Sequence, residues 1–278
     1  MSVASTARAR CRRHHPRRGA FSIVELLVVI GMLAVAASVL LPSLNRARDS
    51  AKNVQCLSNL RQLAMATVMY ANDNNSLMPA GAEASSRKRW DWIYWDASAS
   101  EPALRDSGRS ALAPYLGGAR LSPGRFSVSP QVLRCPADRM DLHPAPAAAG
   151  SARYEYSYAM NAFLCDNSRA YQYGLGLAES RRDRWANFRI SLIRRPGHKV
   201  LFIDRAERTS GDGLWVPVRE GAGDPDPACN ELSDRHEFRK AAGRAREGRG
   251  NVSFVDGHAE FVSRVEVEVN ANTLPLEE

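Results

Sequence analysis

Residues 21–41 form an apolar run, FSIVELLVVIGMLAVAASVLL, in which the one ionisable side chain is Glu25. A helix of this length rises about 1.5 Å per residue and reaches about 31 Å, which matches a bilayer core of about 30 Å. The run therefore predicts a membrane-spanning helix. An ordinary secretory signal peptide has a shorter apolar region before a small-residue cleavage site, whereas here a helical pattern continues beyond the run. We therefore expect the span to stay with the mature protein.

Six arginines and no acidic residue lie in the first twenty residues. By the positive-inside rule, they place the amino terminus in the cytoplasm and the rest of the chain outside. They also account for most of the net charge of +8, because the chain holds 38 basic and 30 acidic residues in all. Without this segment the chain is nearly neutral, so we expect no nucleic-acid partner.

Glu25 is unusual because a carboxylate near the end of an apolar helix costs on the order of a few kcal/mol unless it has a partner. If the chain is cut before Phe21, the new α-amino group lies four residues before Glu25 on the same helix face. The amine of a neighbouring subunit would serve equally well. The alternative is a Glu25 side chain that reaches to the membrane surface. Pro42 lacks the helical hydrogen-bond donor and is expected to bend the helix.

The segment GAFSIVELLVVI, followed by Pro42, resembles the cleavage and methylation segment of type IV prepilins and type II secretion pseudopilins. The resemblance implies that a prepilin peptidase and N-methyltransferase of the bacterial inner membrane cuts the leader and methylates the new terminus. A cut between Ala20 and Phe21 makes Phe21 first, Glu25 fifth and Pro42 twenty-second, as in the family. The commoner glycine rule would place the cut between Gly19 and Ala20 and move each by one. We therefore expect cleavage after Ala20 and methylation of Phe21.

The helical pattern resumes after Pro42 with an apolar stripe of Val54, Leu57, Leu60, Ala64 and Val68. It ends in a polar cluster at 71–75 that favours turns. The expected organisation is a leader at 1–20, a transmembrane helix at 21–42, an amphipathic continuation at 43–72 and an extracytoplasmic head at 73–278.

The second half of the chain contains short runs typical of strands, at residues 132–135, 155–160, 199–204, 251–256 and 258–269. Asp256-Gly257 between two apolar runs predicts a hairpin. A long helix with an antiparallel sheet gives an α+β, pilin-like fold.

The head also resembles prepilin-like proteins that carry a carboxy-terminal element named for a His, nine residues and Asp-Gly. The likeness runs through residues 56–62 with Tyr70, 133–136, 157–161, 234–236 and 251–261. Here nineteen residues separate His236 from Asp256, because an Arg-rich stretch at 237–250 is inserted. Beyond Phe238 the stretch has no aromatic residue for stacking, so we interpret it as an exposed loop.

Four cysteines follow the leader, which itself holds Cys11, and no two of them form a CxxC pair. In an exported protein an even number of cysteines predicts one or two disulfides, and three complete pairings remain open. Buried thiols are the alternative. The four are Cys56, Cys135, Cys165 and Cys229.

Four further side chains, Asp204, His236, Asp256 and His258, have donor types that suit a divalent metal at strand ends. Turn caps and hydrogen bonds are the alternative interpretation, and we expect no cofactor. The sequence contains no GxSxG elbow, HExxH helix, phosphate-binding loop or dinucleotide fingerprint. We therefore expect no enzymatic activity.

The sequence thus predicts a structural subunit of a pilus-like or type II secretion-like filament, with other pilin-like subunits as partners. Whether the filament is a true pilus, a secretion pseudopilus or an assembly with this chain as a minor subunit stays open. The alternative function is a membrane-tethered binding protein that uses the aromatic segment 90–95, RKRWDWIYWD in context. The alternation of Trp90, Trp92 and Tyr94 instead favours a strand or extended segment packed on the head.

Overall fold

The computed structural model describes residues 22–81, 90–95, 105–144, 153–165, 189–209, 213–215, 217, 232–237 and 248–269. The predicted cleavage and methylation residues, Gly19, Ala20 and Phe21, lie outside these ranges, as do Cys229 and most of the Arg-rich stretch. The chain divides into two compact units, Met1–Asn45 and Arg46–Glu278. The amphipathic part of the long helix therefore belongs with the head.

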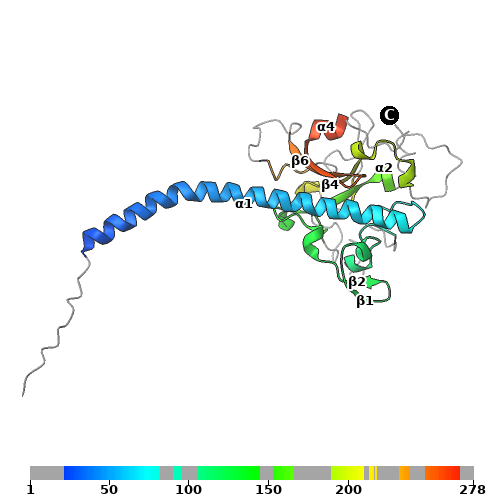
Figure 1. Ribbon diagram of the computed structural model, residues 1–278, viewed down its shortest axis with the longest axis horizontal. Helices are drawn as coiled ribbons and strands as arrows, with labels where there is room; N and C mark the ends of the chain where they lie inside the picture. The colour runs from blue at the N-terminus through cyan, green and yellow to red at the C-terminus, as the bar shows by residue number, and fades with distance from the viewer. Residues whose placement is uncertain are drawn as a thin grey trace, which may run out of the picture. The chain divides into compact units, whose positions relative to one another are not determined.

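Helix α1 runs from Ile23 to Asp73 and is 51 residues long, which confirms the single long helix (Figure 1). Pro42 lies inside it, and helical backbone continues on both sides; the bend at this residue stays a prediction. The helix ends in the polar cluster as expected. Asn75 and Ser76 adopt positive φ angles of 55° and 65°, and the Ser76 N–H donates to the Ala71 carbonyl at 2.8 Å, which satisfies a free helix-end acceptor.

The buried face of α1 lies in its second half and is partly polar. It comprises Cys56, Asn59, Leu60, Leu63, Ala64, Ala66, Thr67 and Ala71. Leu60 and Ala64 were predicted correctly, Leu57 and Val68 are half-buried, and Val54, which is 64% exposed, was predicted wrongly. The buried face is rotated from the predicted stripe and includes polar side chains whose hydrogen bonds are satisfied. Thr67 Oγ1 donates to the Leu63 carbonyl at 2.9 Å, and Asn59 Nδ2 donates to the Gln131 carbonyl at 2.7 Å.

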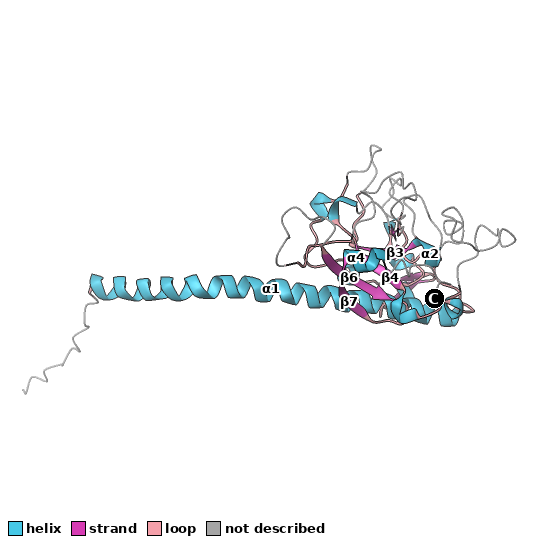
Figure 2. Ribbon diagram, turned by 90° about the horizontal axis from the view of Figure 1, so that it is seen from above, coloured by secondary structure: helices cyan, strands magenta, loops and turns pink. Residues whose placement is uncertain are grey.

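A five-stranded sheet forms the centre of the head, in the order β5-β3-β4-β6-β7 (Figure 2). The strands are β3 (Tyr158–Asn161), β4 (Val200–Asp204), β5 (Leu214–Trp215), β6 (Arg249–Phe254) and β7 (Ala259–Ser263). All neighbours are antiparallel except β3 and β5. With α1, this sheet confirms the α+β, pilin-like fold.

Smaller elements complete the described head. A two-stranded ribbon pairs β1 (Arg120–Ser122) with β2 (Arg125–Phe126). The short α-helices are α2 (Ala162–Cys165) and α4 (Arg264–Val269). The 3-10 turns are Ser107–Arg109, Ala113–Tyr115, Pro130–Leu133, Met140–Leu142, Ile190–Leu192, Pro196–His198 and Glu207–Thr209.

The predicted strands at 199–204 and 251–256, and the hairpin that joins the second of these to the last strand, are confirmed in outline. The run 199–204 is β4, 251–256 overlaps β6, and Asp256-Gly257 makes the β6–β7 turn, with Gly257 at φ 97°. The run 155–160 enters a strand only at Tyr158. The predicted strand at 132–135 is wrong, because a 3-10 turn that begins at Pro130 includes residues 132 and 133. The strand predicted for 258–269 ends at Ser263, and its last part is a helix instead. Ser263 Oγ accepts the Glu266 N–H at 3.1 Å and caps α4.

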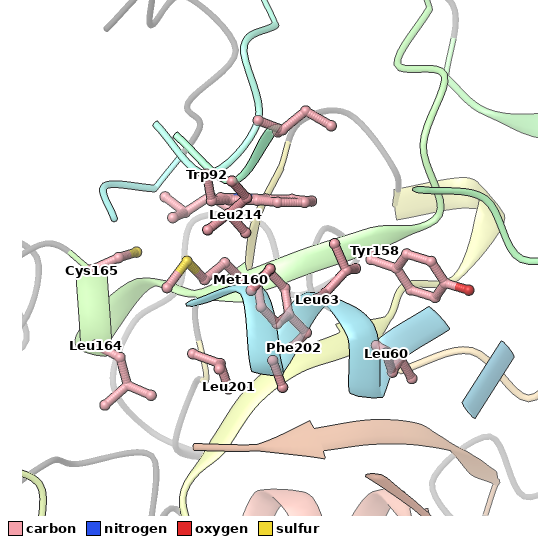
Figure 3. Close-up of a cluster of buried hydrophobic side chains, with 14 of the residues drawn as sticks. Leu60, Leu63, Trp92, Tyr158, Met160, Leu164, Cys165, Leu201, Phe202 and Leu214 are labelled. Atoms are coloured by element: carbon pink, nitrogen blue, oxygen red, sulfur yellow. The ribbon is translucent and has the colours of Figure 1, made fainter. Parts of the chain in front are cut away.

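The core lies between the second half of α1, β3 and β4, and the aromatic segment (Figure 3). The Trp92 ring meets Phe202 edge-on at 5.0 Å, and its indole N–H donates to the Gly213 carbonyl at 2.8 Å. Packing of the segment on the head is confirmed, but the segment is not a strand and its side chains do not alternate between buried and exposed. Residues 92–95 are all buried, because the chain bends there, and Trp90 alone of the aromatic group is exposed, at 44%.

Candidate functional site

The amino-terminal part of α1 presents an uncovered apolar surface. Every described residue from 22 to 52 is exposed, including large apolar side chains such as Ile23, at 78%, and Val39, at 71%. Among the described residues, α1 is the one helix long and apolar enough to cross a membrane, judged by its length and composition. An apolar surface of this size needs lipid or other apolar helices around it. The single helix therefore fits a single-pass membrane anchor.

Glu25 lies in the first turn of this helix and is exposed. The helix amino terminus carries partial positive charge and favours a carboxylate there. The side chain of Ser22 adds a local cap, since its Oγ accepts the Val24 N–H at 3.3 Å. Glu25 is also the one charged residue between 22 and 45. The pairing of Glu25 with the Phe21 amine stays a prediction, because Phe21 lies outside the described residues.

The head contains a second candidate site, a buried cluster formed by Cys56, Cys135, Asp204 and His236. Their potential ligand atoms all lie within 4.8 Å of one another. The Cys56 thiol donates to Asp204 Oδ2 at 3.5 Å, Cys135 Sγ lies 3.1 Å from His236 Nε2, and that nitrogen lies 3.5 Å from Asp204 Oδ2. The cluster thus brings two sulfurs, one nitrogen and one oxygen to a common point.

Four separate segments supply the cluster. Cys56 lies on the buried face of α1, and Asp204 is the last residue of β4. Cys135 follows the 3-10 turn at 130–133, and its N–H donates to Ser157 Oγ at 2.8 Å. His236 lies in a turn shortly after Leu232, which bridges to Arg205 beyond β4. The fold, rather than any local motif, creates this site.

A ring of charged and polar groups surrounds the cluster. Arg235 Nη1 lies 2.7 Å from Asp138 Oδ1 and 3.7 Å from Asp204 Oδ1. Asp138 is also held by Ser157 Oγ, which donates to it at 2.5 Å, and by His143 Nε2 at 3.1 Å. All of these side chains are buried. The guanidinium therefore compensates two buried carboxylates at the edge of the cluster.

Burial shifts the pKa values of the cluster toward uncharged forms. Burial raises the pKa of Asp204 to about 6, despite the nearby Arg235 charge, and raises the pKa of the Cys56 thiol well above its ordinary value. Burial lowers the pKa of His236 to about 4, and the Arg235 charge acts in the same direction. Burial therefore favours the neutral forms of the Cys56 thiol and the His236 imidazole, next to the Asp204 carboxyl and the Arg235 guanidinium.

The four candidate metal ligands predicted from the sequence lie in two different places in the structure. Asp204 and His236 come together. Asp256 and His258 instead pair with each other in the exposed β6–β7 turn, at 2.6 Å between Oδ1 and Nδ1. Sequence reasoning did not connect Cys56 or Cys135 to Asp204 and His236, although the quoted family segments contain three of the four.

Three of the four cysteines after the leader lie in the described residues, and all three are buried free thiols: Cys56, Cys135 and Cys165. Cys165 takes no part in the cluster, and its thiol donates to the Asn161 carbonyl at 3.1 Å. Because Cys229 lies outside the described residues, disulfide pairing among the four stays a prediction.

Comparison with known proteins gives a partial match. The chain is similar to the type IV wide pilus major component PilA4 of Thermus thermophilus, with 39% identity over 56 residues. The match covers 20% of this chain and 43% of the relative, so the chain spans less than half the length of that protein. No protein-family model and no solved structure matches the chain.

Proposed function

We propose that this chain is a structural subunit of a pilus-like or type II secretion-like filament of the bacterial inner membrane, with its amino terminus cytoplasmic and its head extracytoplasmic. The observation that carries the proposal is the first half of α1, which is apolar, uncovered and interrupted by a single carboxylate, Glu25. The similarity to a pilus component supports the same conclusion. The role is structural rather than enzymatic.

In this proposal the leader is removed between Ala20 and Phe21, and the new amine of Phe21 is methylated. A carboxylate in an apolar environment is costly without a partner. The amine of Phe21, on the same chain or on a neighbour, offsets the charge of Glu25 when subunits leave the lipid and join the filament. Lateral packing of the apolar helices then supplies the association.

Mass spectrometry of the chain purified from membranes tests the processing step. The expected product begins at Phe21 and carries one methyl group on its amine. A product that begins at Ala20 would overturn the placement of the cut, and an intact Met1 would overturn processing altogether.

Substitution of Glu25 tests the assembly step. Glu25→Gln keeps the size of the side chain and removes its charge. Loss of the pairing with the Phe21 amine should lower filament incorporation at least about tenfold, which corresponds to about 1.4 kcal/mol of assembly free energy. Sedimentation of sheared filaments measures it. Glu266→Gln, which neutralises an exposed carboxylate on α4, is the matched control and should incorporate normally. Normal incorporation of Glu25→Gln would contradict charge pairing.

A further inference from the structure

The buried cluster in the head has the donor set of a zinc site. Zinc prefers thiolate, imidazole and carboxylate ligands in a tetrahedron, and structural sites use four protein ligands. We propose that Cys56, Cys135, Asp204 and His236 bind one zinc ion, which ties the second half of α1 to the sheet of the head. This site is independent of the proposed filament function.

The spacing of the donors supports tetrahedral coordination. With zinc–sulfur distances of about 2.3 Å and zinc–nitrogen or zinc–oxygen distances of about 2.0–2.1 Å, ligand atoms in a tetrahedron lie about 3.3–3.8 Å apart. Three of the measured separations are 3.5 Å (Cys56 Sγ to Asp204 Oδ2), 3.5 Å (His236 Nε2 to Asp204 Oδ2) and 3.1 Å (Cys135 Sγ to His236 Nε2). The two 3.5 Å separations lie within this range, the 3.1 Å separation is slightly shorter, and all four ligand atoms lie within 4.8 Å of one another. Small side-chain movements would therefore bring the four donors to tetrahedral positions.

The two oxygens of Asp204 face different partners. Oδ2 points to Cys56 and His236, whereas Oδ1 is buried, makes no hydrogen bond and lies 3.7 Å from Arg235 Nη1. Binding forms two zinc–sulfur bonds, breaks two S–H bonds and releases two protons to the buffer. Two thiolates and one carboxylate exceed the ion's charge by one. The Arg235 guanidinium, 3.7 Å from Asp204 Oδ1, offsets part of this excess while it also pairs with Asp138 at 2.7 Å.

Outer contacts hold the ligands in place. The Tyr158 hydroxyl donates to Cys56 Sγ at 3.5 Å, as expected for a group that stabilises a thiolate. Asn59 Nδ2 lies 3.3 Å from the same hydroxyl and donates to it. Since no ligand residue is more than 6% exposed, the site has no open position for a substrate, which indicates a structural ion.

A disulfide between Cys56 and Cys135 is the competing arrangement in an oxidising compartment. It would use the two sulfurs alone and leave Asp204 and His236 buried beside them without a role. The convergence of all four donors, from four segments, favours the metal.

Metal analysis of the full chain in detergent tests the proposal. We expect one zinc ion per chain after addition of zinc salt under reducing conditions and removal of excess. Cys135→Ser and His236→Gln should lower the zinc content about tenfold or more. The matched controls Cys165→Ser, a buried thiol outside the cluster, and His258→Gln, an exposed imidazole, should keep it. Equal zinc content in all four variants would overturn the site.

Two measurements on the unaltered chain keep the test independent of variant folding. Cobalt(II) in place of zinc should give a thiolate-to-metal charge-transfer band and tetrahedral d–d bands; absence of both would overturn the proposal. Alkylation before cell lysis, followed by peptide mapping, should show that Cys56 and Cys135 are not joined in a disulfide. Alkylation of both thiols should become faster when a zinc chelator is added, whereas alkylation of Cys165 should not change. A Cys56–Cys135 disulfide in that map would also overturn it.

Discussion

Asn59 is expected to hold the loop before Cys135 against α1. Its buried side-chain amide lies within donor distance of the Gln131 carbonyl at 2.7 Å, the Arg134 carbonyl at 3.0 Å and the Tyr158 hydroxyl at 3.3 Å. The substitution Asn59→Ala removes both N–H donors from a buried site and leaves two peptide carbonyls without them.

The cost follows from these contacts. A buried hydrogen-bonding group left unsatisfied costs about 1–3 kcal/mol. Two unsatisfied carbonyls, with some local relaxation of the loop, should lower the free energy of unfolding by about 2–4 kcal/mol. For a unit of this size, each kcal/mol lowers the melting temperature by about 2–4 °C, so we expect a fall of about 5–15 °C. Asn59→Asp keeps the volume but turns a carboxylate toward the carbonyls, and should cost at least as much.

Thermal unfolding of the full chain in detergent, followed by tryptophan fluorescence, measures the effect because Trp92 and Trp95 are buried in the same core. Gln62→Ala, the loss of an exposed amide on the same helix, is the control and should change stability by less than about 0.5 kcal/mol. If Asn59→Ala and Gln62→Ala melt together, the loop does not depend on Asn59.

Three further substitutions test other parts of the head. Gly257→Ala should destabilise by about 1–3 kcal/mol in urea unfolding, because φ is 97° and a Cβ would lie 2.7 Å from the Met65 sulfur; an unchanged midpoint would contradict the strained turn. Trp92→Phe should cost about 2–4 kcal/mol through its lost hydrogen bond and volume, while the exposed control Trp90→Phe should stay within about 0.5 kcal/mol. Burial acts to raise the pKa of Asp138, but its hydrogen bond to a histidine and a nearby guanidinium outweigh burial and lower that pKa. Its ionised form therefore stabilises the fold above the unfolded pKa of about 3.9, and this contribution is lost as the pH falls through the lower folded pKa. Asp138→Asn should flatten the acid-unfolding profile in that range, and an unchanged profile would refute the assignment.

The features predictable from the sequence were those set by local chemistry. An apolar run of bilayer length predicts α1, and the Asp256-Gly257 pair predicts its hairpin because the turn needs a positive φ. The apolar run at 199–204 also predicts the strand β4, which is buried along its whole length. In each case neighbouring residues determine the structure.

The predictions from the sequence failed in two ways: at a local helix cap that periodicity does not show, and where distant segments meet. The alternating residues 264–269 fit a strand by periodicity, yet Ser263 caps a helix there. The parallel pairing of β3 with β5 joins segments that no local pattern connects. The buried cluster likewise needs four segments to meet, so His236 and Asp204 could be named from the sequence but not matched to Cys56 and Cys135.

The two outer strands of the described sheet bear on whether the heads of neighbouring copies can pair through their edges. One edge, β5, is only two residues long. The other, β7, carries the exposed charge of Glu260 and runs directly into α4. Short and charged edges resist the addition of strands from other chains. Edge-to-edge pairing between crowded heads is therefore disfavoured by the sheet itself.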